Sequence, residues 1–135
     1  MSTSKDMPHT RILIRILAWI PVILYSTFIL GVTIFSRSTG TERIVKALFW
    51  KVKNRMWHDI RMNILLFLPL GILLGACFRS WKAVLVGVLL SACIEIIQYV
   101  GMLGYCEADD MLNNTIGTAL GLGLWKMSGR RLGNR

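Results

Sequence analysis

The chain has 135 residues, a formal net charge of +9 and 54% hydrophobic side chains. Soluble domains are about 45–50% apolar, and here the excess is gathered into long apolar blocks, which indicates a membrane protein of one domain. Three cysteines, two of them inside apolar blocks, argue against a disulfide framework, and no Cys/His spacing typical of a zinc site occurs. The basic residues flank the apolar blocks, which favours contact with anionic lipid over nucleic acid.

The first apolar block covers residues 12–35 and is long enough to cross a hydrocarbon core of about 30 Å. A cleaved signal peptide is the rival interpretation, but the block is too long for a typical signal and lacks a convincing small-residue cleavage site. Three further helices are expected at about 63–78, 83–100 and 111–125, joined by short turns. The sequence therefore predicts an all-α integral membrane protein, a four-transmembrane-helix bundle, in a single domain over residues 1–135.

The connector between the first two expected helices is long and basic. From Ile44 onward its apolar residues recur on one arc of a helical wheel, and most of its lysines and arginines fall on the other side. This pattern predicts an amphipathic interfacial helix over about 41–57, between helices 1 and 2 of the bundle. The alternative is an ordinary solvated connector whose periodicity is accidental.

Polar residues stand at one end of each of the last three expected helices. Short links make these helices alternate in direction, so the start of the second, the end of the third and the start of the fourth share one side of the membrane. We expect one polar cluster there, made of Asn63, Glu95, Gln98, Asp109, Asp110 and Asn114, with His58 close by. Small residues at spacings of three and four continue each polar stripe and predict closely packed helix seams; they are Gly71, Gly75, Gly87, Ser91, Gly117 and Gly121.

Glu95 is the least easily explained of these side chains. It has no Lys or Arg within helix reach, so it must be protonated, hydrated, bound to a cation or paired across helices. Asn63 and Asn114 are explained well enough as interhelical hydrogen bonds, and one of Asp109 and Asp110 as a cap of the fourth helix. Glu95 and Asp110 are the candidate catalytic residues, because two carboxylates could hold a divalent cation or supply a general base.

Three runs of residues resemble the signatures of VanZ-like membrane proteins. Residues 63–71 resemble N-x-L-x-F-x-P-x-G, Ser91 to Gln98 resembles S-x-x-x-E-x-x-Q, and Asp109 to Gly117 resembles D-D-x-x-x-N-x-x-G. The resemblance covers about half of the chain and implies a bacterial envelope protein related to one associated with glycopeptide (teicoplanin) resistance. Relatives often carry an arginine shortly before the acidic run; residues 101–108 have none, and Glu107 stands where an aspartate is common.

Three functions follow as hypotheses. The polar cluster could bind or modify a lipid-linked cell-wall or surface molecule, with the basic connector attracting phosphate or anionic lipid. It could instead hold the bundle of a non-enzymatic accessory or scaffold protein together. A small transporter is less favoured, because the polar residues gather at one face and not at mid-depth. Nine basic residues on the terminal side against seven on the other predict a multi-pass protein of the bacterial cytoplasmic membrane with both termini cytoplasmic.

Overall fold

The computed structural model describes residues 8–37, 39–40 and 45–133, and it is all-helical apart from one short strand pair. Five helices occur in the described residues: α1 (Pro8–Phe35), α2 (Trp50–Lys53), α3 (Trp57–Phe78), α4 (Lys82–Val100) and α5 (Ala108–Gly133). The strands β1 (Val45–Lys46) and β2 (Cys106–Glu107) pair in parallel. Helices therefore form at all four positions where the sequence predicted them, each extended at one end or both.

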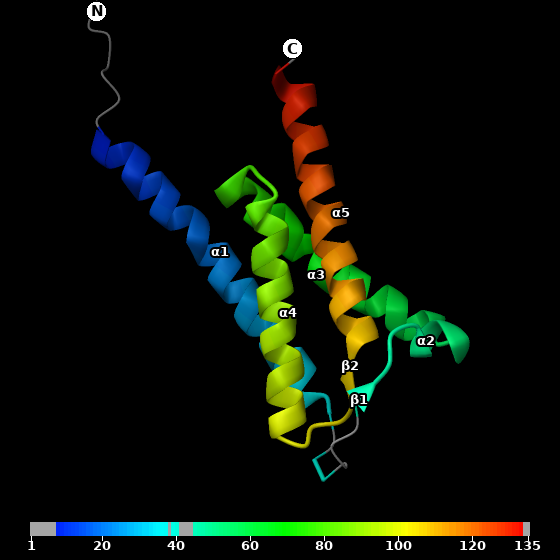
Figure 1. Cartoon of the computed structure of the whole chain (residues 1–135). Helices are drawn as coiled ribbons and strands as arrows, with labels where there is room; N and C mark the ends of the chain where they lie inside the picture. Colours follow the sequence, from blue (N-terminus) through cyan, green and yellow to red (C-terminus); the bar gives the residue numbers. More distant parts are fainter. Residues whose placement is uncertain (1–7, 38, 41–44, 134–135) are drawn as a thin grey trace, which may run out of the picture.

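The helices run alternately along the bundle. The start of α1, the α3–α4 turn and the end of α5 lie at one end, while α2, both strands and the α4–α5 connection lie at the other (Figure 1). Helix α3 packs most extensively against α5, and α1 packs against α3. The alternation expected from the short turns is therefore present.

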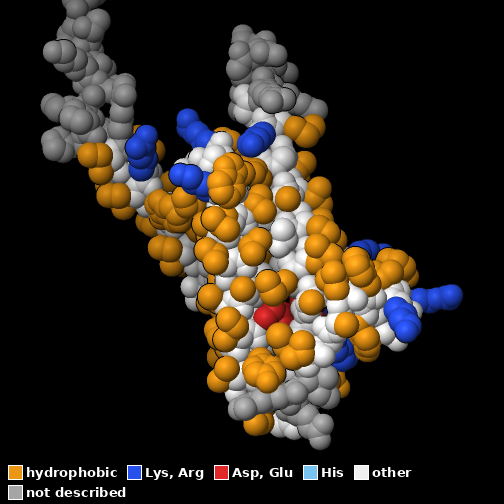
Figure 2. Space-filling model, in the orientation of Figure 1, with side chains coloured by type: hydrophobic (Ala, Val, Ile, Leu, Met, Phe, Trp, Pro, Cys, Tyr) orange, Lys and Arg blue, Asp and Glu red, His pale blue; other side chains and the backbone are white. Residues whose placement is uncertain are grey.

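Three helical segments are long and apolar enough to cross a membrane: Ile12–Phe35, Trp57–Phe78 and Lys82–Val100. Their outward side chains are large and apolar, with Ile14 61% and Leu24 66% exposed, as suits a lipid-facing surface. Orange side chains cover much of the surface in Figure 2. The fourth span expected at about 111–125 is not among these segments, because Asn113, Asn114 and several glycines lower the mean hydropathy of α5.

The continuous amphipathic helix expected at about 41–57 does not form in the described residues. Residues 41–44 lie outside them; Val45 and Lys46 form β1, and only Trp50–Lys53 is helical before α3 begins at Trp57. Phe49 and Arg55 adopt positive φ angles on either side of α2, which interrupts any regular helix. The periodicity was a poor guide because β2 and α5 contact this segment, and those tertiary contacts override local propensity.

The helix seams expected from the small residues are confirmed. A Cβ on Gly71 would lie 2.1 Å from the Thr118 carbonyl oxygen, and one on Gly121 would lie 2.1 Å from the Leu68 carbonyl oxygen. Neither space admits a methyl group, so α3 and α5 approach backbone to backbone. This close crossing brings the polar start of α3 next to the polar start of α5.

Candidate functional site: a buried polar cluster

A buried polar cluster lies where α1 and α4 end, α3 and α5 begin, and α2 and the strand pair cover the bundle. Its carboxylates are almost fully enclosed: Glu95, Glu107, Asp109 and Asp110 are 3–5% exposed. Burying ionised groups is costly unless charge partners and hydrogen bonds compensate. The members of the cluster are Arg37, Lys46, Lys51, Asn63, Ser91, Glu95, Gln98, Glu107, Asp109, Asp110 and Asn114.

Asp110 lies at the centre of this cluster. Its Oδ1 accepts hydrogen bonds from the Lys51 ammonium and the Asn63 amide, and Arg37 Nη2 lies 3.3 Å from its Oδ2. The donors come from α2, from α3 and from the residues just after α1. Asp110 therefore joins three parts of the chain that are far apart in sequence.

Lys51 connects two acidic residues although its own side chain is buried. Its Nζ also lies 2.8 Å from Glu107 Oε2, while Lys46 Nζ lies 3.7 Å from Glu107 Oε1. Burial alone would lower the pKa of Lys51, but the hydrogen bonds and charges of Asp110 and Glu107 outweigh it and raise that pKa. The ammonium is therefore held in its charged form.

Asp109 serves the connector and not its own helix. Its two carboxylate oxygens accept the backbone N–H groups of Phe49 and Lys51, the latter at 2.7 Å. These contacts fix the start of α2 and so aim the Lys51 side chain at Asp110. The sequence suggested that one aspartate caps the fourth helix; the contacts of Asp109 go to α2 instead.

Glu95 is satisfied by a backbone amide, a solution that the sequence did not suggest. Its Oε2 accepts the Glu107 N–H at 2.8 Å, which ties the last turns of α4 to β2. The strand pairing then places Lys46 opposite Glu107. Among the described residues, Glu95 forms no salt bridge.

The side-chain amides of Gln98 and Asn114 form hydrogen bonds between neighbouring helices. Gln98 Nε2 donates to the Thr33 carbonyl of α1 at 3.2 Å, and Asn114 Nδ2 donates to Ser91 Oγ at 2.8 Å. The Gln98 Oε1 and Asn114 Oδ1 atoms are buried, and within the described structure neither accepts a hydrogen bond. The buried Glu107 Oε2 has the Lys51 ammonium at 2.8 Å, so the two amide oxygens are the acceptors left unused among the described residues.

The structure brings most of the predicted residues together but leaves one apart. Asn63, Asp109 and Asp110 share one network with Lys51, and Glu95 joins it through Glu107. His58 lies outside: its side chain is 77% exposed and pairs with Asp59 at 3.6 Å. Any catalytic role of Glu95 and Asp110 stays a prediction.

Sequence reasoning missed the cations that face the acidic residues. Arg37 and Lys51 were visible only as members of a basic connector, 73 and 59 residues from Asp110. A divalent cation at Glu95 and Asp110 also stays a prediction. No group of three or more His, Cys, Asp or Glu side chains that could hold a metal ion occurs within the described ranges.

A small pocket opens beside the cluster, between α1 and α3. Its volume is about 180 Å³, and Arg37 and Asn63 form part of its lining. The Arg37 side chain is 28% exposed, whereas that of Asp110 is 4% exposed. The guanidinium of Arg37 is thus the accessible edge of the cluster. The lining residues are Val32, Thr33, Ser36, Arg37, Met62, Asn63 and Leu66.

These features define an all-α membrane protein whose apolar helices enclose a charged cluster at one end of the bundle. The chain belongs to the VanZ/LLP1 family, whose model matches residues 13–129. It is also 33% identical over 79 residues to Protein VanZ of Enterococcus faecium, covering 54% of this chain and 47% of that protein. The chain thus spans about half the length of this curated relative. No solved structure matches.

Proposed function

We propose that this protein is a VanZ-like component of the bacterial envelope that binds the anionic head of a lipid-linked cell-wall or surface molecule. The binding lowers susceptibility to glycopeptides such as teicoplanin. The observation that carries the proposal is the partly exposed Arg37 guanidinium in the pocket between α1 and α3. Guanidinium groups suit phosphate because their planar N–H groups match its oxygens.

The surroundings of Arg37 fit an amphiphilic ligand. Val32, Met62 and Leu66 supply apolar wall, while Thr33, Ser36 and Asn63 supply polar groups beside the guanidinium. Asp110 holds Arg37 from the buried side at 3.3 Å, and Arg37 Nη1 lies 3.5 Å from the Tyr105 carbonyl oxygen, so two contacts fix the position of the guanidinium in the pocket lining. Membership of the VanZ/LLP1 family and the similarity to Protein VanZ support the envelope role. The protein is proposed to lie in the cytoplasmic membrane with both termini cytoplasmic.

The test compares Arg37→Gln with Arg61→Gln at equal protein abundance. Arg61 is an exposed arginine of α3 that does not line the pocket, so it controls for general loss of charge. The readouts are teicoplanin susceptibility of cells and retention of an isoprenoid diphosphate by the purified protein in native mass spectrometry. Arg37→Gln should lose both, and Arg61→Gln should keep both. Unchanged susceptibility and retention in Arg37→Gln would refute the proposal.

A scaffold function without chemistry or ligand is the second candidate, and a specific observation favours it. Glu95 and Asp109 both accept backbone N–H groups, so two of the acidic residues serve the fold directly. In that case Glu95→Gln, which keeps an acceptor oxygen, should leave the protein fully active. Arg37→Gln should then reduce the amount of folded protein while the protection per folded molecule stays constant.

A further inference from the structure

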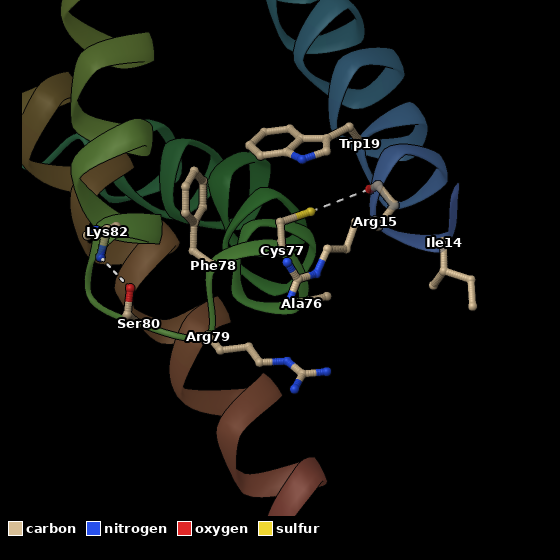
Figure 3. Close-up of a pocket in the computed structure, with 10 residues that line it drawn as sticks. Ile14, Arg15, Trp19, Ala76, Cys77, Phe78, Arg79, Ser80 and Lys82 are labelled. Carbon is tan, nitrogen blue, oxygen red and sulfur yellow. Dashed lines mark hydrogen bonds between the residues drawn. The ribbon is translucent and has the colours of Figure 1, made fainter. Parts of the chain in front are cut away.

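A second pocket lies at the opposite end of the bundle, far from the buried polar cluster. It has a volume of about 510 Å³, within the range of ordinary ligand sites. Figure 3 shows it between the first turns of α1 and the α3–α4 turn. The lining residues are Ile14, Arg15, Ala18, Trp19, Ala76, Cys77, Phe78, Arg79, Ser80 and Lys82.

The charged side chains that line this basic pocket are all positive in the part of the chain that the structure describes. They are Arg15, Arg79 and Lys82. Within the described parts of the chain, none of these three side chains forms a salt bridge. Figure 2 shows blue side chains at this end and also around α2, while the red ones in this view lie toward the α2 end. Cations that share a pocket without counter-charges favour an anionic occupant.

The same pocket has an apolar wall. Trp19 and Phe78 meet edge to face with ring centroids 5.3 Å apart, and Ile14 is 61% exposed beside them. A tryptophan near the end of a membrane span suits the headgroup level of a bilayer. A cationic rim above an apolar wall matches a phospholipid, whose phosphate and acyl chains are adjacent.

The backbone of Arg79 gives an independent reason to look for a role of its side chain. Arg79 ends α3 with φ 54, in the left-handed region that usually holds glycine at this position. A side chain there costs on the order of 1 kcal/mol. Glycine would close the helix without this cost, which makes the Arg79 side chain worth testing for a role beyond the helix end.

We propose that this basic pocket binds the phosphate of an anionic phospholipid of the surrounding bilayer. Arg15 and Arg79 hold the phosphate oxygens, Lys82 adds a third positive charge, and the acyl chains lie along Ile14, Trp19 and Phe78. The site is separate from the Arg37 pocket, so it stands or falls independently of the proposed function.

Native mass spectrometry of the full-length protein, released from mixed vesicles of phosphatidylglycerol and phosphatidylcholine, tests the assignment. The wild type should retain phosphatidylglycerol preferentially, and Arg15→Gln/Arg79→Gly should reduce that retention at least about tenfold. Lys126→Gln is the matched control, since Lys126 is exposed in the last turns of α5, next to Trp125 that packs near the end of α3, but does not line the pocket. Equal retention of both lipids, an unaffected double variant, or an equal loss in the control would overturn the proposal.

A second measurement leaves the charges intact and so does not depend on the folding of the double variant. Cys77 lines the pocket, whereas Cys93 and Cys106 do not. In the Cys93→Ala/Cys106→Ala protein, phosphatidylglycerol should slow the reaction of Cys77 with a small maleimide, while phosphatidylcholine and inorganic phosphate should not. Protection by phosphate alone would assign the site to a free anion and overturn the lipid assignment.

Discussion

Replacing Lys51 with methionine would remove the ammonium that Asp110 and Glu107 share, leaving Asp110 with Arg37 and Glu107 with Lys46 as their cationic partners. Lys51 is 4% exposed, and its Nζ contacts both carboxylates. Breaking a buried ion pair by removing one member costs about 3–5 kcal/mol. For a chain of this size that corresponds to a loss in midpoint temperature on the order of 10 °C. Thermal unfolding of the detergent-solubilised protein measures it.

The control is Lys53→Met, which removes an exposed lysine two residues further along the same short helix. The free energy of unfolding of Lys53→Met should lie within about 0.5 kcal/mol of the wild-type value, as is usual for substitutions at exposed positions. Adding Asp110→Asn to Lys51→Met should recover part of the loss, because removing one negative charge restores the net charge that the buried cluster has in the wild type. Equal midpoints for Lys51→Met and Lys53→Met would refute the view that this ion pair holds the connector onto the bundle.

The stability that the ion pairs of Lys51 contribute should fall, and not rise, at alkaline pH. The pKa of Lys51 is raised in the folded protein, so its stabilising contribution is fully present below the ordinary lysine pKa. The contribution is lost as the pH rises through the raised pKa, which lies above the ordinary lysine value. The difference in stability between the wild type and Lys51→Met should therefore be constant through neutral pH and shrink only in strong alkali.

Two further substitutions test the packing and the connector. Gly121→Ala should destabilise the bundle by about 1–3 kcal/mol, because its methyl group would meet the Leu68 carbonyl at 2.1 Å, whereas Gly123→Ala has open space and should be neutral in the same unfolding assay. Asp109→Ala leaves two backbone N–H groups at the start of α2 without their acceptor. Each unsatisfied N–H group should lower the free energy of unfolding by about 1–3 kcal/mol. Hydrogen exchange should rise first at Lys51 and Phe49, and protection there equal to the wild type would contradict the anchoring role.

The sequence was sufficient to predict the helices and the end at which their polar residues meet. Apolar length defined the helices, and the short turns fixed their alternation. The glycine spacings predicted closely packed seams, and one of these seams is the α3–α5 crossing that places Asn63 beside Asp110. All of this depends on regular helical geometry, which converts spacing along the chain directly into position in space.

The connector could not be predicted in the same way. Its conformation depends on Asp109, which lies 58 residues away from Lys51 in the sequence. It also depends on the pairing of the two-residue strand β1 with β2, and two long helices separate these strands along the chain. No local periodicity records such contacts. The hydrogen-bond partner of Glu95 could not be predicted for a related reason. It is the backbone N–H of Glu107, and almost any amino acid at position 107 would supply the same N–H group.

The two adjacent aspartates show how one short motif can carry two physically different roles. Asp109 binds backbone amides and determines where α2 begins, whereas Asp110 binds side chains and determines which charges face one another. Because Asp109 positions Lys51 and Lys51 neutralises Asp110, the second contact depends on the first. Arg37 then completes the neutralisation of Asp110 from the accessible side. The acidic pair therefore supports the basic edge of the pocket, and under the proposed function the choice of ligand should follow the geometry of Arg37 more than the carboxylates beneath it.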